Sequence, residues 1–174
     1  MKKQWKKYEH FFHQRSYPAK TVLLKEGDIA RSLFFIKKGC LREGFTEGGR
    51  EITFQFFFEG ERVASFESFM MSRPSEMFIE TIEPTTVNIL KKKDFDFLIK
   101  KFPVLKEQFV RVIVMRFTHY AKLFRSHITN NPKQRYLELL NNEPRIIQRV
   151  PLQYIASYLG ITPVSLSRIR SKIR

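Results

Sequence analysis

The sequence predicts an α+β protein in which a β-roll, a long helix and a C-terminal helix-turn-helix follow one another. Short apolar runs separated by turns occupy about residues 21–92. A helical apolar stripe follows over about 103–128, and two short helical patterns joined by a glycine lie after residue 150. A chain of 174 residues holds one large domain or two small ones. We expect boundaries at 1–101 (roll with an N-terminal helix), 102–129 (connecting helix) and 130–174 (helix-turn-helix).

The predicted strands of the roll are short and end at turn residues. They cover 21–24, 32–37, 40–45, 51–58, 78–82 and 86–90. Glu47-Gly-Gly-Arg has the composition of a hairpin turn between two of these runs. Strands at roughly ten-residue spacing with glycine turns are typical of a sandwich or barrel.

Two helices are expected after the roll, over 92–101 and from Pro103 to about Ile128. Asn130-Asn131-Pro132 then breaks the chain before a helix that begins at Lys133. Apolar side chains recur along the longer helix in a heptad-like stripe: Val110, Ile113, Val114, Phe117, Tyr120, Ala121, Phe124 and Ile128. This stripe either packs on the roll or pairs with a second copy of the chain, and we favour the homodimer.

The last two dozen residues have the pattern of a helix-turn-helix. An apolar stripe on the first helix comprises Leu152, Ile155, Ala156 and Leu159. Gly160 allows a sharp end, Thr162 can cap the next helix, and Pro163 suits its first turn. Spacing predicts that the buried side of the second helix carries Leu166, Ile169 and Ile173. Val164, Ser167, Arg168 and Ser171 then face outward, as base-reading side chains would in a major groove.

Charge supports double-stranded DNA as the partner. The chain carries a net charge of +15, and from Arg111 onward twelve Lys and Arg face two acids. This is the footprint of a duplex binder. Anionic membranes also attract basic proteins, but no apolar run is long enough to span a bilayer, so we expect no membrane partner. The expected DNA-binding residues are Thr162, Val164, Ser165, Ser167, Arg168, Arg170, Ser171 and Lys172. No signal peptide precedes the roll, so we expect a cytoplasmic protein.

Four segments together resemble the cyclic-AMP receptor protein/FNR (Crp/Fnr) family of bacterial transcription regulators. They are Leu-Lys-Glu-Gly-Asp at 24–28, Leu-Phe-Phe-Ile-Lys-Lys-Gly-Cys-Leu-Arg at 33–42, Gly-Glu-Arg-Val at 60–63 and Tyr-Ile-Ala-Ser-Tyr-Leu-Gly-Ile-Thr at 154–162. The resemblance spans residues 10–173. It implies a jelly roll like a cyclic-nucleotide-binding domain, a homodimer that binds DNA and RNA polymerase, a small-molecule signal sensed in the roll, and no enzymatic activity.

The sequence departs from the family pattern where a cyclic nucleotide would bind. Ala64-Ser65 and Ser75-Glu76 stand where the family has Gly-Glu for the ribose and Arg-Ser for the phosphate. A carboxylate in place of the cationic clamp repels phosphate, so we expect no cyclic AMP and no cofactor. The residues of the expected effector pocket are Ala64, Ser65, Phe66, Arg73, Ser75 and Glu76. The β-hairpin wing that family members carry after the reading helix is expected to be missing or truncated.

Other classes fit less well. One cysteine, Cys40, cannot hold an iron–sulfur cluster, and we expect no metal site. A cupin metalloenzyme would need barrel histidines, and residues 21–92 have none. Hydrolase and phosphate-loop motifs are also absent from the sequence. A degenerate sensor of the same fold without specific DNA binding stays open as the alternative.

Overall fold

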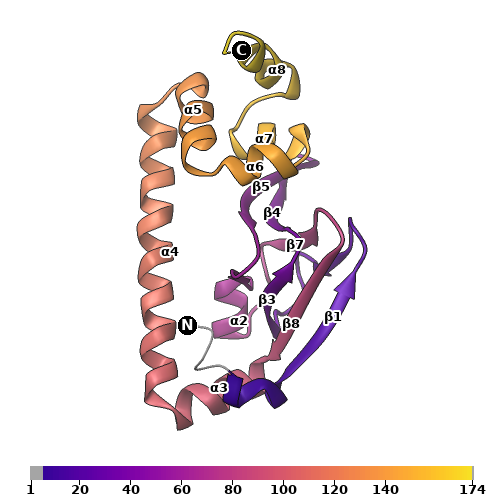
Figure 1. Cartoon of the computed structure of the whole chain (residues 1–174), viewed down its shortest axis with the longest axis vertical. Helices are drawn as coiled ribbons and strands as arrows, with labels where there is room; N and C mark the ends of the chain where they lie inside the picture. The colour runs from indigo at the N-terminus through magenta and orange to yellow at the C-terminus, as the bar shows by residue number, and fades with distance from the viewer. Residues whose placement is uncertain (1–5, 174) are drawn as a thin grey trace. The chain divides into compact units, whose positions relative to one another are not determined.

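The computed structural model describes residues 6–173. The chain divides into two compact units, and the boundary in the sequence lies between Leu98 and Ile99. Figure 1 shows their helices and strands. The first unit is built mainly of strands and the second of helices. The predicted α+β class, with a jelly-roll-like domain followed by helices, is therefore confirmed.

The first unit contains two four-stranded antiparallel sheets. One has the order β1 (Phe12–Tyr17), β8 (Thr85–Lys91), β3 (Ser32–Lys38) and β6 (Arg62–Val63). The other has the order β2 (Val22–Leu24), β7 (Phe78–Thr81), β4 (Leu41–Glu47) and β5 (Arg50–Phe57). The 3-10 helix η1 (Lys6–Phe11) precedes them, α2 (Phe66–Met71) follows β6, and α3 (Lys92–Lys101) follows β8.

The predicted hairpin turn joins β4 to β5. Gly48 and Gly49 have φ values of 57° and 75°, which residues with a side chain rarely adopt. Glu47 pairs with Arg50 across the turn. In the same ladder Leu41 pairs with Phe57, and both are fully buried. The turn sets the register near the hairpin, and a register shift between Glu43 and Gly44 then brings Leu41 opposite Phe57 on the core face.

Three elements of the roll have too little sequence signal to be predicted. All six predicted strands match observed strands, namely β2, β3, β4, β5, β7 and β8. The strand β1 was not predicted, because its side chains are mostly exposed and show no apolar alternation. Its backbone pairs with β8 along six residues. The segment is therefore a strand because of this pairing and not because of its own sequence pattern. β6 has two residues and α2 has six, lengths at which periodicity carries no information.

A buried ionic cluster lies on the second sheet and was also missed from the sequence. Arg42 on β4 is 2% exposed, and its Nε donates to Glu80 Oε2 at 2.7 Å. Its Nη2 pairs with Glu51, and its guanidinium lies 4.8 Å from the ring centre of Phe78. Register explains the cluster, because Arg42 pairs directly with Glu80 on β7. A buried arginine of this kind needs both carboxylates to offset its desolvation.

The second unit consists of a long helix and four shorter ones. They are α4 (Pro103–Thr129), α5 (Pro132–Asn142), α6 (Pro144–Arg149), α7 (Leu152–Tyr158) and α8 (Pro163–Ser171). The predicted long helix and the break before α5 are confirmed, whereas α6 was not predicted. Asn131 caps α5 in a capping box, since its side chain accepts from the Gln134 N–H and the Gln134 side chain accepts from its N–H. The buried core of these helices includes Tyr136, Leu139, Ile146, Ile155 and Leu166.

Candidate nucleic-acid interface and sensor site

The turn between α7 and α8 is a Schellman motif. Gly160 has φ of 66°, and its N–H donates to the Ser157 carbonyl at 3.0 Å. The Ile161 N–H donates to the Ala156 carbonyl at 3.0 Å, which completes the six-to-one bond of the motif. The predicted sharp end of the first helix is confirmed, and a side chain at Gly160 would strain it.

Thr162 begins α8 as predicted. Its Oγ1 accepts from the Ser165 N–H at 3.1 Å, and Pro163 occupies the first turn, where no N–H partner is needed. Leu166 is fully buried and anchors the helix on α7. Ile169 and Ile173, expected on the buried side, are only half-buried.

The structure shows where each predicted DNA-binding residue lies. Those with exposed side chains are Thr162, Val164, Ser167, Arg168, Ser171 and Lys172, whereas Ser165 and Arg170 are half-buried. Val164 is 61% exposed. Two hydroxyls are engaged within the helix: Ser165 Oγ accepts from Thr162 Oγ1, and Ser171 Oγ donates to the Arg168 carbonyl. The Arg168 guanidinium is left free to reach outward.

Arg135 on α5 fixes the first helix of the motif, and sequence reasoning missed it. Its Nη1 donates to the Asn130 carbonyl at 2.8 Å, and its Nη2 donates to the Leu159 carbonyl at 2.9 Å. Both carbonyls lie at helix ends, after α4 and at the end of α7, where intrahelical partners are lacking. One side chain therefore connects the end of α4, helix α5 and the turn of the motif. Its sequence context, Lys-Gln-Arg in a basic region, gives no signal of this role.

Tyr158 is the last residue of α7, and its phenol is largely buried. Burial, together with the Glu143 carboxylate and the phenol of Tyr120, raises the pKa of Tyr158 to about 12. The side chain is therefore neutral across the physiological range, and the helix end carries no added negative charge.

The predicted stripe on α4 is largely exposed in the single chain. Val110, Val114, Phe117, Phe124 and Ile128 are 49–74% exposed, and Ala121 lies between them on the same face. Ile113 and Tyr120, which were predicted as part of the stripe, are half-buried instead. The exposed members recur at alternating intervals of four and three residues, as the a and d positions of a coiled coil do.

The residues of the expected effector pocket do not form an open polar cradle. Ser65 and Ser75 are buried and their hydroxyls bond each other at 2.7 Å, while Ser75 Oγ also contacts the carbonyl and N–H of Met77. Phe66, Arg73 and Glu76 are exposed, and Ala64 is half-buried. The Ser68 hydroxyl ties α2 down further, since it donates to the Arg73 carbonyl and accepts from the Ala30 N–H. The serine hydroxyls of this segment are thus used internally, whereas the charged side chains of Arg73 and Glu76 face solvent.

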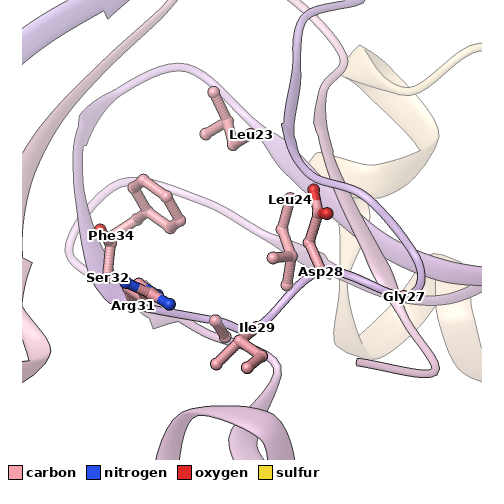
Figure 2. A pocket seen from close by; sticks show the side chains of 9 residues that line it. Leu23, Leu24, Gly27, Asp28, Ile29, Arg31, Ser32 and Phe34 are labelled. Atoms are coloured by element: carbon pink, nitrogen blue, oxygen red, sulfur yellow. The ribbon is translucent and has the colours of Figure 1, made fainter. Parts of the chain in front are cut away.

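A separate cavity of about 490 Å³ opens between β2, β3 and the loop that joins them (Figure 2). Leu23, Leu24 and Phe34 form its apolar walls, with the side chains of Asp28 and Arg31 at its margin. None of the six expected effector residues lines it. The joining loop is held to the β7 side by backbone bonds, from the Gly27 N–H to the Ser75 carbonyl and from the Ser75 N–H to the Asp28 carbonyl.

Within residues 6–173, no helix is both long and apolar enough to cross a membrane. The same range contains no cluster of three or more His, Cys, Asp or Glu side chains placed to hold a metal ion.

Comparisons with known proteins agree with the fold. CLP, described as a cyclic-di-GMP-responsive global regulator of Xanthomonas campestris, superposes with a TM-score of 0.80 at 20% identity, covering 99% of this chain and 91% of that one. FixK2 of Bradyrhizobium japonicum gives 0.83 at 16% identity, covering 93% and 84%. A CooA variant from Carboxydothermus hydrogenoformans gives 0.76 at 17% identity, covering 98% and 79%.

A search of curated protein sequences finds no match. The family model described as the cyclic nucleotide-binding domain matches residues 14–102, which is more than half of the chain. The predicted resemblance to Crp/Fnr regulators is thus confirmed in fold, both in the roll and in the helices that follow. The chain belongs to the cyclic nucleotide-binding domain family.

Proposed function

We propose that the chain is a homodimeric, sequence-specific DNA-binding transcription regulator without enzymatic activity, which acts in the cytoplasm and has RNA polymerase as a further partner. The observation that carries the proposal is the exposed face of α8. A Schellman turn and a threonine cap fix the start of this helix, and Leu166 buries its opposite side. What remains outside is a set of small, hydroxylated and basic side chains, which suits a helix lying in a major groove.

The side chains of α8 divide by the contact each can make. The Arg168 guanidinium can bond two acceptors of guanine, and Val164 can pack on a thymine methyl group. Ser167 lies beside them on the exposed face. Thr162, Ser165, Arg170, Ser171 and Lys172 are assigned to the phosphate backbone, toward which the first turn of α8 also presents N–H groups.

The exposed stripe of α4 supports a two-fold dimer. Its exposed residues follow a heptad spacing along a 27-residue helix, and monomeric proteins rarely leave so many large apolar side chains in water. Pairing two α4 helices would bury Phe117 and Phe124, which are 74% and 70% exposed. A two-fold dimer places two copies of α8 on half-sites one helical turn of DNA apart.

The roll is proposed to be a sensor that does not use cyclic AMP. The hydroxyls of Ser65 and Ser75 are hydrogen-bonded to each other. The next residue is Glu76, whose carboxylate stands where a phosphate would need a cation. Arg73 is exposed on the same segment, after the end of α2. Calorimetric titration with cyclic AMP is expected to show no saturable heat, and binding in the micromolar range would overturn this part of the proposal.

Two substitutions on α8 test the DNA interface. Arg168→Ala is expected to cost about 1–3 kcal/mol on the cognate duplex and to relax one base position, because a bidentate base contact is lost. Lys172→Ala is expected to weaken cognate and random duplexes alike and to lower the salt slope by about one, because it removes one phosphate contact. Fluorescence anisotropy across salt concentrations measures both. Equal loss from Arg168→Ala on both duplexes would reduce it to a phosphate contact.

The competing function is a sensor or protein-interaction module of the same fold without specific DNA binding. It would be favoured if neither substitution changed the preference of the protein for one duplex over another.

A further inference from the structure

A second cavity in the first unit is lined mainly by basic side chains. It has a volume of about 830 Å³ and lies where η1, β1, the β2–β3 loop and the start of α3 come together. Figure 1 shows η1 and α3 at the same end of the roll. We call this the cationic cavity; its basic lining residues are His10, His13, Arg31, Lys91, Lys92 and Lys93. Asp94 is the acidic residue among those that line it.

Not all of these cations are neutralised by the protein. Lys92 Nζ is paired with both carboxylate oxygens of Asp96 at 2.6 Å. Lys91 Nζ donates to the Ser32 hydroxyl at 3.2 Å and is given no ion pair among the described residues. Arg31 and Lys93 are exposed, and the structure gives neither of them an ion pair within residues 6–173. At least three unpaired positive charges therefore face one concave space that holds one carboxylate.

The first turn of α3 adds to this positive potential. Lys92 and Lys93 begin the helix, and the Lys92 N–H donates to the Arg31 carbonyl at 3.0 Å. The following N–H groups of the first turn have no intrahelical partner, and the helix dipole places partial positive charge at this end. Such a helix start beside unpaired cations favours a bound anion.

The cavity also has an aromatic wall. Phe11 lines it together with His10, and the two rings lie 4.2 Å apart between centres. Its volume falls in the range of about 300–1,000 Å³ that is typical of small-ligand sites. The combination of several phosphate-binding cations and a ring surface fits a molecule with two or more phosphates and a planar base.

We propose that the cationic cavity binds a small organic polyphosphate of the nucleoside di- or triphosphate class. Arg31, Lys91 and Lys93 hold the phosphates, and the His10–Phe11 wall contacts the base. None of the expected effector residues lines this cavity, and neither does any residue of α8. The cavity does include Ser72, which follows α2, so a ligand here would contact the chain between Ser65 and Ser75. The proposal does not depend on DNA binding.

Calorimetric titration of the full chain with pyrophosphate, adenosine triphosphate and adenosine tests the site. We expect saturable binding of both phosphorylated probes, tighter for the nucleotide, and none for adenosine. If pyrophosphate bound as tightly as adenosine triphosphate or more tightly, the His10–Phe11 wall would not contact the base, and the cavity would bind polyphosphate alone. Failure of both phosphorylated probes to bind would overturn it.

A matched pair of double variants shows whether the cavity itself is responsible. Arg31→Ala/Lys93→Ala is expected to weaken triphosphate binding at least tenfold. Lys25→Ala/Lys100→Ala removes the same charge from exposed positions outside the cavity and is expected to change binding less than twofold. Equal losses would mean that only net charge matters, which contradicts a built site.

Thermal unfolding and duplex binding of the same variants complete the test. All four substituted side chains are exposed, so both variants are expected to keep the parent Tm without ligand. Triphosphate is expected to raise the Tm of the parent and of the control but not of the cavity variant. If instead the cavity variant loses duplex affinity while no phosphorylated probe binds, the surface is a DNA contact and the proposal is wrong.

Discussion

Replacing Arg135 by alanine should weaken the helix-turn-helix from a position outside its two helices. The guanidinium makes two hydrogen bonds, to the carbonyls of Asn130 at 2.8 Å and Leu159 at 2.9 Å. A hydrogen bond to a charged group contributes about 1.5–3 kcal/mol, so the two together set an upper limit near 6 kcal/mol. The side chain is only half-buried and its Nε is buried without a partner, which lowers the net value. We expect a loss of about 2–3 kcal/mol.

The assay is urea unfolding followed by circular dichroism at 222 nm, which reports mainly on the helices of the second unit. Lys133→Ala is the matched control, since it removes one positive charge from an exposed position on the same helix. We expect the control to change stability by less than about 0.5 kcal/mol. Similar small losses for both variants would refute the assignment of Arg135 as the link between α5 and the turn. A second readout is cognate duplex affinity, which should fall more for Arg135→Ala than for its control.

Three further outcomes follow from the described contacts. Arg42→Ala should destabilise the roll by roughly 3 kcal/mol in thermal unfolding, because it leaves Glu80 mostly buried without its cation; a loss below about 1 kcal/mol would contradict this. Phe117→Glu should convert the dimer to monomer in sedimentation equilibrium, whereas Lys122→Glu, an exposed position off the stripe, should not. Tyr158 should titrate in ultraviolet absorbance near pH 12. Because its pKa is raised in the folded state from 10.0, its contribution to stability is complete below pH 10 and is lost between pH 10 and 12; titration at pH 10 would contradict this.

The helix-turn-helix could be predicted because its local signals agree with one another. Gly160, Thr162 and Pro163 each have a conformational role that depends on their immediate neighbours in sequence, and the structure assigns each of them that role. The same holds for Gly48 and Gly49 at the hairpin. Turn and cap chemistry acts over three or four residues, so it is readable from a single sequence.

Features that depend on distant residues were not predicted. The strand β1 exists because β8, some seventy residues later, pairs with it. Arg42 and Arg135 look like ordinary surface cations in sequence, and only the register of β4 against β7 and the approach of α5 to α7 give them buried or bridging partners. The contacts among the predicted effector residues could not be predicted for the same reason. The resemblance to the family placed Ser65 and Ser75 at the ribose and phosphate positions, whereas in the structure their hydroxyls bond each other.

Half-buried Ile169 and Ile173 show that periodicity predicts a face of a helix but not how deeply that face is buried. Spacing assigned them correctly to the same face as Leu166, but a face is buried only as far as another element covers it. The exposed apolar residues of α4 illustrate the reverse case. Their heptad spacing was read correctly as a stripe, while the single chain leaves Phe117 and Phe124 uncovered.

Selection of binding sites from random duplexes, repeated at several salt concentrations and with and without cyclic AMP, tests the central claim most directly. For a dimeric, sequence-specific regulator we expect a palindromic consensus with half-sites one helical turn apart, which persists as salt rises and is the same with and without the nucleotide. Binding that disappears with salt and leaves no consensus would contradict a specific regulator. A consensus recovered only with cyclic AMP would contradict the account of the Ser65–Ser75 segment.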